Sequence, residues 1–384
     1  MSLILKSNII ATRSLGNING IKGSQDWLYF ADLEGETILK RTGTKVDPVS
    51  DTLLLKNTGS INMLAKPITM TKEGVESFVP STDTLRYLRD SSTGRYGLAA
   101  ECSARMNYFS NSTNPATQTI TLPASPVVIV SVEGTGSLTL TSTNISETYT
   151  VTANNPVSFV PVENIAFDLV CTVNGSLTHA QVSRTYGMST VASRIYTPTL
   201  TGLQNTIKGV DNIELQSSIV NELTNSNSDG ITIVVQHIPY RLIAEEAKAS
   251  VTNTRLIEAK DSSSKALGWS IFVDKERGFS TRQAQYDGSI ESHATIGSSG
   301  TLTASKGVVS AITIKNGELI TSCNGAKATT STTDMNISEV MQIILGVATS
   351  TGTSTATNNI ITKLALYNKS MSNDELVELS KSWL

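Results

Sequence analysis

The sequence predicts an all-β protein, and two observations carry this prediction. Of the 384 residues, 48 are Ser and 50 are Thr, so about a quarter of the chain carries a small hydroxyl. This composition favours sheets and turns over long helices, because Thr is branched at Cβ and Ser competes with helical hydrogen bonds. Short alternating segments also follow one another at intervals of about ten residues through the middle of the chain, which is typical of antiparallel sandwiches. We therefore expect a small antiparallel β-sandwich in the middle and a larger jelly-roll sandwich after it, closed by a short helix.

Charge density divides the chain into three parts. Residues 1–95 carry 12 Lys and Arg and 10 Asp and Glu, residues 96–190 carry only 2 and 5, and residues 191–384 carry 16 and 18. In the first part we expect short strands at 26–33, 51–55 and 60–64. This part has too little apolar material for a core of its own, so it should be an attachment and oligomerisation segment that packs on a partner chain or on other copies of itself.

The middle part, 96–190, has the clearest strand pattern. Thr119 and Thr121 alternate with Ile120 and Leu122, which places one face of the sheet in water and the other in a core. The Asn174–Gly175 pair supplies residues that tolerate positive φ in a hairpin turn. The sequence predicts strands at 117–122, 127–134, 136–143, 147–153, 157–162 and 166–175.

The last part, 191–384, repeats this pattern on a larger scale and suits a two-sheet jelly roll. Its helix is expected to begin after Ser372, because Glu375 follows at the capping-box spacing and Met371 and Leu376 occupy the positions of a hydrophobic staple. Leu376 and Trp383 then lie on one apolar stripe that should dock on the sandwich. Strands are predicted at 230–238, 254–260, 267–275, 278–285, 308–317, 318–324, 340–348 and 360–368.

Several function classes are disfavoured by composition and motif content. A net charge of −3 gives no basic field for a nucleic-acid backbone, so we expect no nucleic-acid partner. The usual nucleotide, zinc, calcium-loop and serine-elbow signatures do not occur, and the three Cys and three His are scattered, so no cofactor and no metal are expected. Lys6, Asn8 and Arg13 interrupt the first apolar run, so we expect no signal peptide, no membrane insertion and synthesis in a cytoplasm.

The C-terminal run resembles the closing strand and helix of concanavalin-A-like (laminin-G-like) lectin and glucanase sandwiches. The similarity spans roughly residues 200–384 and implies a lectin-type fold for this part. In that family a strand ending in Tyr-Asn is followed by a basic residue, a capped turn and an acidic helix. The matching residues are Leu366, Tyr367, Asn368, Lys369, Ser372, Asp374 and Glu375.

A second stretch, residues 83–182, is similar to a linker and small β module of bacteriophage tail-fibre and other virion proteins. The sequence departs from that pattern at Ala99, Ala100, Cys102, Ser103 and Met106. The similarity implies a virion structural protein, and a trimer is the expected oligomer because many such fibres are trimeric. The matching residues are Thr93, Gly94, Arg95, Gly97, Leu98, Glu101, Ala104, Arg105 and Asn107.

These resemblances lead to a functional hypothesis. We expect a non-enzymatic bacteriophage appendage, a tail fibre, tail-tip or baseplate protein located in the virion. Residues 1–95 would attach it to other virion proteins, 96–190 would be a spacer, and 191–384 would bind host cell-surface polysaccharide or lipopolysaccharide, or a neighbouring virion protein. A capsid-decoration or head-fibre protein is the first alternative and a polysaccharide depolymerase the second.

Sugar binding needs aromatic faces beside polar side chains, and few aromatic residues are available. We expect the glycan-binding candidates in loops that follow predicted strands: Tyr240, Arg241, Tyr286, Asp287 and His293. Glycoside hydrolysis would need two carboxylates across a cleft. Glucanases of this fold carry the two carboxylates within one strand, as Glu-x-x-x-Glu or Glu-x-Asp-x-x-Glu. The nearest candidates are Glu245 with Glu246, which are adjacent rather than spaced, and Asp287 with Glu291, which are spaced by four but lie in a Gly/Ser-rich loop without an aromatic platform. No catalytic residue is therefore predicted.

Overall fold

The computed structural model covers most of the chain. The described residues are 26–57, 68–78, 84–89, 94–101, 105–124, 127–185, 199, 206–208, 211–225, 229–239, 254–261, 266–274, 278–286, 291–299, 307–326, 329–332, 336–345 and 358–383.

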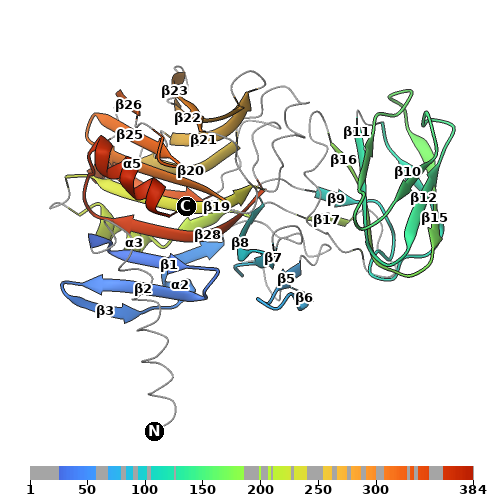
Figure 1. Cartoon of the computed structure of the whole chain (residues 1–384), viewed down its shortest axis with the longest axis horizontal. Helices are drawn as coiled ribbons and strands as arrows, with labels where there is room; N and C mark the ends of the chain where they lie inside the picture. The colour runs from blue at the N-terminus through green and yellow to red at the C-terminus, as the bar shows by residue number, and fades with distance from the viewer. Residues whose placement is uncertain are drawn as a thin grey trace, which may run out of the picture.

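The prediction of an all-β fold is confirmed: the chain forms antiparallel sheets arranged as a large and a small sandwich (Figure 1). The first sheet of the large sandwich runs in the order β26 (Thr329–Thr332), β25 (Glu318–Cys323), β24 (Val308–Lys315), β19 (Ile231–Pro239), β28 (Asn358–Tyr367), β1 (Tyr29–Asp32), β2 (Thr37–Thr42) and β3 (Lys45–Pro48). Two more of its strands, β8 (Tyr96–Glu101) and β7 (Tyr87–Arg89), continue from the far end of β28. The second sheet runs in the order β23 (Glu291–Ser299), β22 (Gly278–Tyr286), β21 (Ala266–Asp274), β20 (Thr254–Asp261), β27 (Val340–Leu345), β18 (Ile213–Leu215) and β4 (Leu55–Asn57).

The first 95 residues do not form a separate segment, and this corrects the expected division at residue 95. β1 pairs with β28, where Tyr29 lies opposite Leu366, and β4 pairs with β18, where Leu55 lies opposite Leu215. The apolar content of these residues is too small for an independent core, and the chain's own C-terminal strands complete a shared one. The reason for expecting a homo-oligomer therefore falls away, and the trimer stays a prediction.

Two local expectations in this region have different outcomes. The predicted strand at 51–55 is wrong over most of its length, because Asp51–Leu54 forms the one-turn helix α2 before β4 begins. An aspartate in the first turn suits a helix start, which explains the change. The predicted strand at 60–64 lies outside the described residues.

The small sandwich is inserted into the large one. One sheet has the order β10 (Gln118–Leu122), β15 (Phe167–Asn174), β12 (Ser137–Thr141) and β13 (Tyr149–Val151). The other has the order β14 (Val157–Phe159), β11 (Val127–Gly134) and β16 (Leu177–Thr185). The alternation predicted for β10 is confirmed, because Ile120 and Leu122 are buried while Thr119 and Thr121 face solvent.

A two-stranded neck connects this insert to the large sandwich. β9 (Arg105–Asn107) leads into the insert, β17 (Thr206–Lys208) returns from it, and the two pair antiparallel with Met106 opposite Ile207. Figure 1 shows the insert standing to one side of the large sandwich, with β9 and β17 between them. The insert and its neck thus occupy 105–208, rather than the expected 96–190.

The C-terminal helix is confirmed in detail. α5 (Asn373–Ser382) starts with the predicted capping box, in which Ser372 N donates to Glu375 Oε2 at 2.8 Å and Ser372 Oγ accepts from Glu375 N. Leu376 and Trp383 are buried with Trp27 and Phe30 on the outer face of the first sheet. That sheet is therefore covered on both faces. No helix in the described part of the chain is long and apolar enough to span a bilayer.

Candidate functional site

Beside β7, the end of β4 meets the segment that begins β7 and the segment that follows the insert. At the centre of this contact is a buried ion pair, in which Arg86 Nη2 lies 2.5 Å from Asp211 Oδ2 and Arg86 Nε lies 3.2 Å from Asp211 Oδ1. The exposed fractions of the two side chains are 0% and 1%. A buried charge is costly unless it is paired, so each residue fixes the position of the other.

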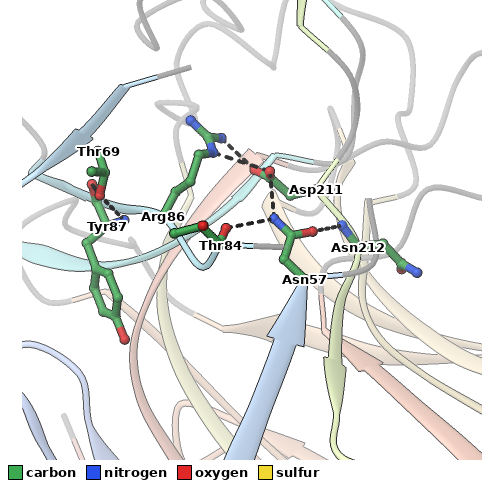
Figure 2. Close-up of polar contacts among 7 residues, drawn as sticks. All are labelled: Asn57, Thr69, Thr84, Arg86, Tyr87, Asp211 and Asn212. Carbon is green, nitrogen blue, oxygen red and sulfur yellow. Dashed lines mark hydrogen bonds and ion pairs between the residues drawn. The ribbon is translucent and has the colours of Figure 1, made fainter. Parts of the chain in front are cut away.

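Asn57 completes this cluster from the end of β4. Its Nδ2 donates to Asp211 Oδ1 and to the Thr84 carbonyl, each at 3.3 Å, and its Oδ1 accepts from the Asn212 backbone N–H at 3.2 Å. Figure 2 shows the Asn57 amide between Thr84 and Asn212, with the Arg86 guanidinium directed at Asp211. We call Asn57, Arg86 and Asp211 the junction lock. It holds together the chain just before the insert and the chain just after it.

Residues of the virion-linker motif sit around the lock. Arg95 makes a bidentate ion pair with Glu34, in which Nε donates to Oε1 at 2.9 Å and Nη2 donates to Oε2 at 2.8 Å. Gly97 lies so close to β28 that a Cβ atom at this position would be 2.3 Å from the Ile361 carbonyl oxygen. Gly94 has φ +68°, in the region that favours glycine. Arg95 therefore holds the start of β8 against the β1–β2 turn, and Gly97 lets β8 approach β28.

Another motif residue anchors the neck to the insert. Asn107 is fully buried, and its Nδ2 donates to the Ala180 carbonyl at 3.1 Å. Its Oδ1 accepts from the backbone N–H groups of Phe109 and Val182, both at 3.0 Å. One amide side chain thus joins the end of β9 to β16 of the insert.

A surface beside the lock carries the polar and aromatic groups that suit ligand binding. The rings of Tyr87 and Tyr96 stack at 5.6 Å with 20° between their planes. Tyr87 OH donates to Asp51 Oδ2 at 3.2 Å, and the Tyr96 phenol is hydrogen-bonded to Glu36. Arg89, which is exposed on the same hairpin, donates from Nε to the Gly94 carbonyl at 3.0 Å. We call Glu36, Asp51, Tyr87, Arg89 and Tyr96 the tyrosine surface.

The protonation of the two phenols is set by their surroundings. Burial, with the nearby Asp51 charge, raises the pKa of Tyr87 well above its usual value. Burial, with the Glu36 charge and hydrogen bond, raises the pKa of Tyr96 to about 12. Both phenols stay neutral at ordinary pH and donate to carboxylates. Glu36 is exposed and Asp51 half-buried, so their remaining lone pairs can accept from ligand hydroxyls, while Arg89 can donate.

The sequence-predicted glycan residues are placed only in part. Tyr240, Arg241 and Asp287 lie outside the described residues. Tyr286 ends β22 opposite Glu291, and His293 lies on β23 opposite Ala284, so the two belong to neighbouring strands at one end of the second sheet. Their glycan-binding role stays a prediction.

The junction residues were missed because their sequence signal is weak. Arg86 lies among Leu85, Tyr87 and Arg89 and Asp211 between Val210 and Asn212, with no motif around either, and a charged side chain is usually exposed. In the described part of the chain, no group of three or more His, Cys, Asp or Glu side chains is placed to hold a metal ion. Cys171 and Cys323 are buried free thiols, as expected for these two residues.

Comparison with known proteins gives partial likenesses to solved structures. The carbohydrate-binding module CBM40 of a Ruminococcus gnavus sialidase, bound to α2,3-sialyllactose, is 16% identical with a TM-score of 0.28, over 40% of this chain and 83% of that one. Domain 4 of a GH43 arabinanase from Geobacillus stearothermophilus, in complex with arabinotriose, is 13% identical with a TM-score of 0.30, over 44% and 73%. A Trypanosoma rangeli sialidase mutant with trans-sialidase activity is 14% identical with a TM-score of 0.31, over 45% and 27%. The chain matches no protein-family model and no curated relative.

Proposed function

We propose that this protein is a non-enzymatic appendage of a bacteriophage particle that binds cell-surface glycan. The observation that carries the proposal is the junction lock, which fixes both ends of an inserted β-sandwich on the body of a second one. The two sandwiches have separate cores, and a β module that projects on a neck from a second one suits an attachment protein. The resemblance of residues 83–182 to virion linkers supports the particle role, because its motif residues Arg95 and Gly97 fix β8 on the large sandwich and Asn107 fixes β9 on the insert.

The tyrosine surface is the proposed contact with glycan. Sugar hydroxyls are recognised by acceptors and donors placed beside an apolar ring. Glu36 and Asp51 supply acceptors and Arg89 supplies donors. The half-buried Tyr87 ring, which stacks on the buried Tyr96 ring, supplies the aromatic edge. The phenol donors are committed to the two carboxylates, so these groups are held in place before a ligand arrives. A preorganised site of this kind loses less entropy on binding.

The test is binding of the purified full chain to host cells and to capsule or lipopolysaccharide, with released oligosaccharide measured in the same samples. We expect binding without release. Replacing Glu36→Gln and Asp51→Asn together should weaken it at least tenfold, because two charged acceptors are lost. The matched control is Lys45→Ala with Asp47→Asn, which removes two charges from the β2–β3 hairpin and should leave binding unchanged.

Other outcomes would assign the function differently. If Tyr286→Ala with His293→Ala abolishes binding while the acceptor variant does not, the glycan site lies at the end of the second sheet. Binding to capsids with no binding to cells or glycan would favour head decoration. Released oligosaccharide would favour a depolymerase, and substitution of Glu245, Glu246, Asp287 and Glu291 would then locate the acid.

A further inference from the structure

Three polar side chains meet on the outer face of the second sheet, directly beside the junction lock: Lys56, Asn212 and Glu214. Lys56 on β4 lies opposite Glu214 on β18 in the antiparallel register, and Asn212 precedes Glu214 by two residues. The neighbouring side chains of Leu55 and Ile213 belong to the large core. Because successive side chains of a strand point to opposite faces, Lys56 and Glu214 project from the other side of the sheet.

The Glu214 carboxylate contacts both of the other groups. Its Oε2 lies 3.3 Å from Lys56 Nζ, and its Oε1 accepts from Asn212 Nδ2 at 2.7 Å. The Glu214 side chain is 7% exposed, whereas the Lys56 side chain is 36% exposed. The amine and the amide nitrogen are thus held on the two oxygens of one buried carboxylate, and the flexible lysine stem has room to change rotamer.

The junction lock fixes the backbone on both sides of this group. Asn57, which follows Lys56, accepts from the Asn212 backbone N–H at 3.2 Å. Figure 2 shows this contact, with the Asn212 side chain directed away from Asn57. Asp211, which precedes Asn212, is held by Arg86. The segments that carry the amine and the amide are therefore kept side by side, and such proximity accelerates a reaction between two groups.

We propose that Lys56 and Asn212 form an isopeptide bond, with Glu214 as the proton carrier. A lysine amine becomes a nucleophile when an adjacent base takes its proton, and Glu214 is placed as that base. The proton passes from Lys56 Nζ to Glu214 Oε2, the amine attacks Asn212 Cγ, and the carbonyl electron pair moves to Oδ1. This goes beyond the proposed function, because it is a covalent modification of the chain itself, whatever its ligand.

The reaction balances without a co-reactant. When the electron pair on Oδ1 re-forms the carbonyl, the bond between Cγ and Nδ2 breaks and Nδ2 leaves as ammonia. Of the three protons on Lys56 Nζ at the start, one stays on the isopeptide nitrogen and one reaches the departing Nδ2 through Glu214. The third is released to solvent from the carboxyl group. A C–N bond replaces a C–N bond, so nothing is oxidised or reduced.

The product is a covalent ring that contains the whole insert. The new bond joins β4 to the segment that enters β18, and residues 105–208 lie between its two ends. The junction lock holds the same two segments by non-covalent contacts. A cross-link that closes so long a loop also restricts the unfolded chain, so it stabilises the folded one.

The experiment is mass spectrometry of the purified full chain after unfolding in urea and digestion with trypsin. An isopeptide bond prevents cleavage after Lys56, and Lys66 is followed by Pro67, so the lysine peptide should be 46–72. The asparagine peptide is 209–241. We expect the two to stay joined, with a mass equal to their sum less one ammonia. Simple deamidation of Asn212 would leave them separate.

Two variants assign the roles, and a third is the matched control. Lys56→Arg keeps a positive charge opposite Glu214 but has no primary amine, so the joined peptide should be absent. Glu214→Gln keeps the shape and removes the proton carrier, so the joined fraction after equal incubation should fall at least about tenfold. Lys40→Arg should leave the link intact, because Lys40 pairs with Glu222 at 2.9 Å and is 32% exposed, close to Lys56.

Two results would overturn the proposal. One is a wild-type chain whose two peptides stay separate after incubation for days, and the other is a joined peptide of this mass that persists in Lys56→Arg. Circular dichroism checks that each variant is folded. If Glu214→Gln does not fold, Asn212→Ala takes its place, and the joined peptide should again be absent.

Discussion

Arg86 and Asp211 are separated by 125 positions in the sequence, and the whole inserted sandwich lies between them, yet their side chains meet as a buried ion pair. An ordinary salt bridge on the surface contributes little to stability. This one is different because neither partner has water as an alternative. The pair therefore requires the segment that follows the insert to lie directly beside the segment that precedes it.

Replacing Asp211 with Ala should therefore lower the free energy of unfolding by about 3–5 kcal/mol, because it removes the carboxylate that neutralises the buried Arg86 guanidinium. Denaturant unfolding of the full chain measures this loss. Asp47→Ala removes one member of an exposed pair on β3 and should cost less than about 1 kcal/mol.

A double variant separates the contribution of the two charges from that of the buried side-chain volume. Arg86→Met with Asp211→Leu removes both charges and keeps apolar bulk, so it should recover most of the stability lost in Asp211→Ala. A single Asp211→Ala variant as stable as the wild type would mean that the pair is not buried in solution.

The strands themselves could be predicted from the sequence, but their partners could not. The alternation of Ile120 with Thr121 is a local signal, and so is the Ser372–Glu375 capping box. By contrast, nothing near Tyr29 in the sequence indicates that it lies opposite Leu366. Pairing of this kind is decided by the apolar area that the whole chain can bury, which explains why a segment without its own core was assigned to a partner chain.

The arrangement of the two cores leads to a prediction about excision. The large core draws its members from 26–101 and 213–366, and the core of the insert from 106–182. Joining residue 104 to residue 209 through a short Gly-Ser linker should therefore leave a folded large sandwich. Residues 105–208 expressed alone should fold as well. Thermal unfolding followed by circular dichroism checks both.

A fragment cut at residue 190, the expected domain boundary, should behave differently from these two. Residues 191–384 alone lack β1, β4 and β8, which exposes the apolar flanks of β28 and β18. We expect this fragment to aggregate or to lack a cooperative transition. A stable fold for 191–384 would contradict the shared core and restore the division at residue 190.

The candidate site was less predictable than the fold. The linker resemblance singled out Arg95, Gly97 and Asn107, and the structure gives each a contact at the junction. Tyr87 and Tyr96 were not singled out, because a stack between two strands depends on register. Tyr96 lies opposite Arg89, which is what places its ring beside Tyr87.

Cys171 should respond to pH in a direction set by its burial. Burial raises the pKa of its thiol to about 12, so the native thiol stays neutral at pH 9 while an unfolded one is largely ionised. Native Cys171 should resist iodoacetamide at that pH and react fully in urea, as measured by peptide mass spectrometry. Because the folded pKa is the higher one, this group's contribution to stability is complete below about pH 8.5 and declines as the pH rises towards 12, by at most about 1.4 kcal/mol per unit. Rapid native alkylation would show that β15 opens readily.

Gly97 tests the close approach of β8 to β28. A Cβ here would lie 2.3 Å from the Ile361 carbonyl oxygen, a backbone atom that cannot move without opening the sheet. Gly97→Ala should therefore cost about 3 kcal/mol in the free energy of unfolding. Gly43→Ala is the control, because its Cβ meets nothing within 4 Å and only its φ of +62° is unfavourable, which costs about 1 kcal/mol. Denaturant unfolding compares the two. Equal losses would mean that β8 does not press on β28, and the junction would then depend on the Arg86–Asp211 pair without the support of this contact.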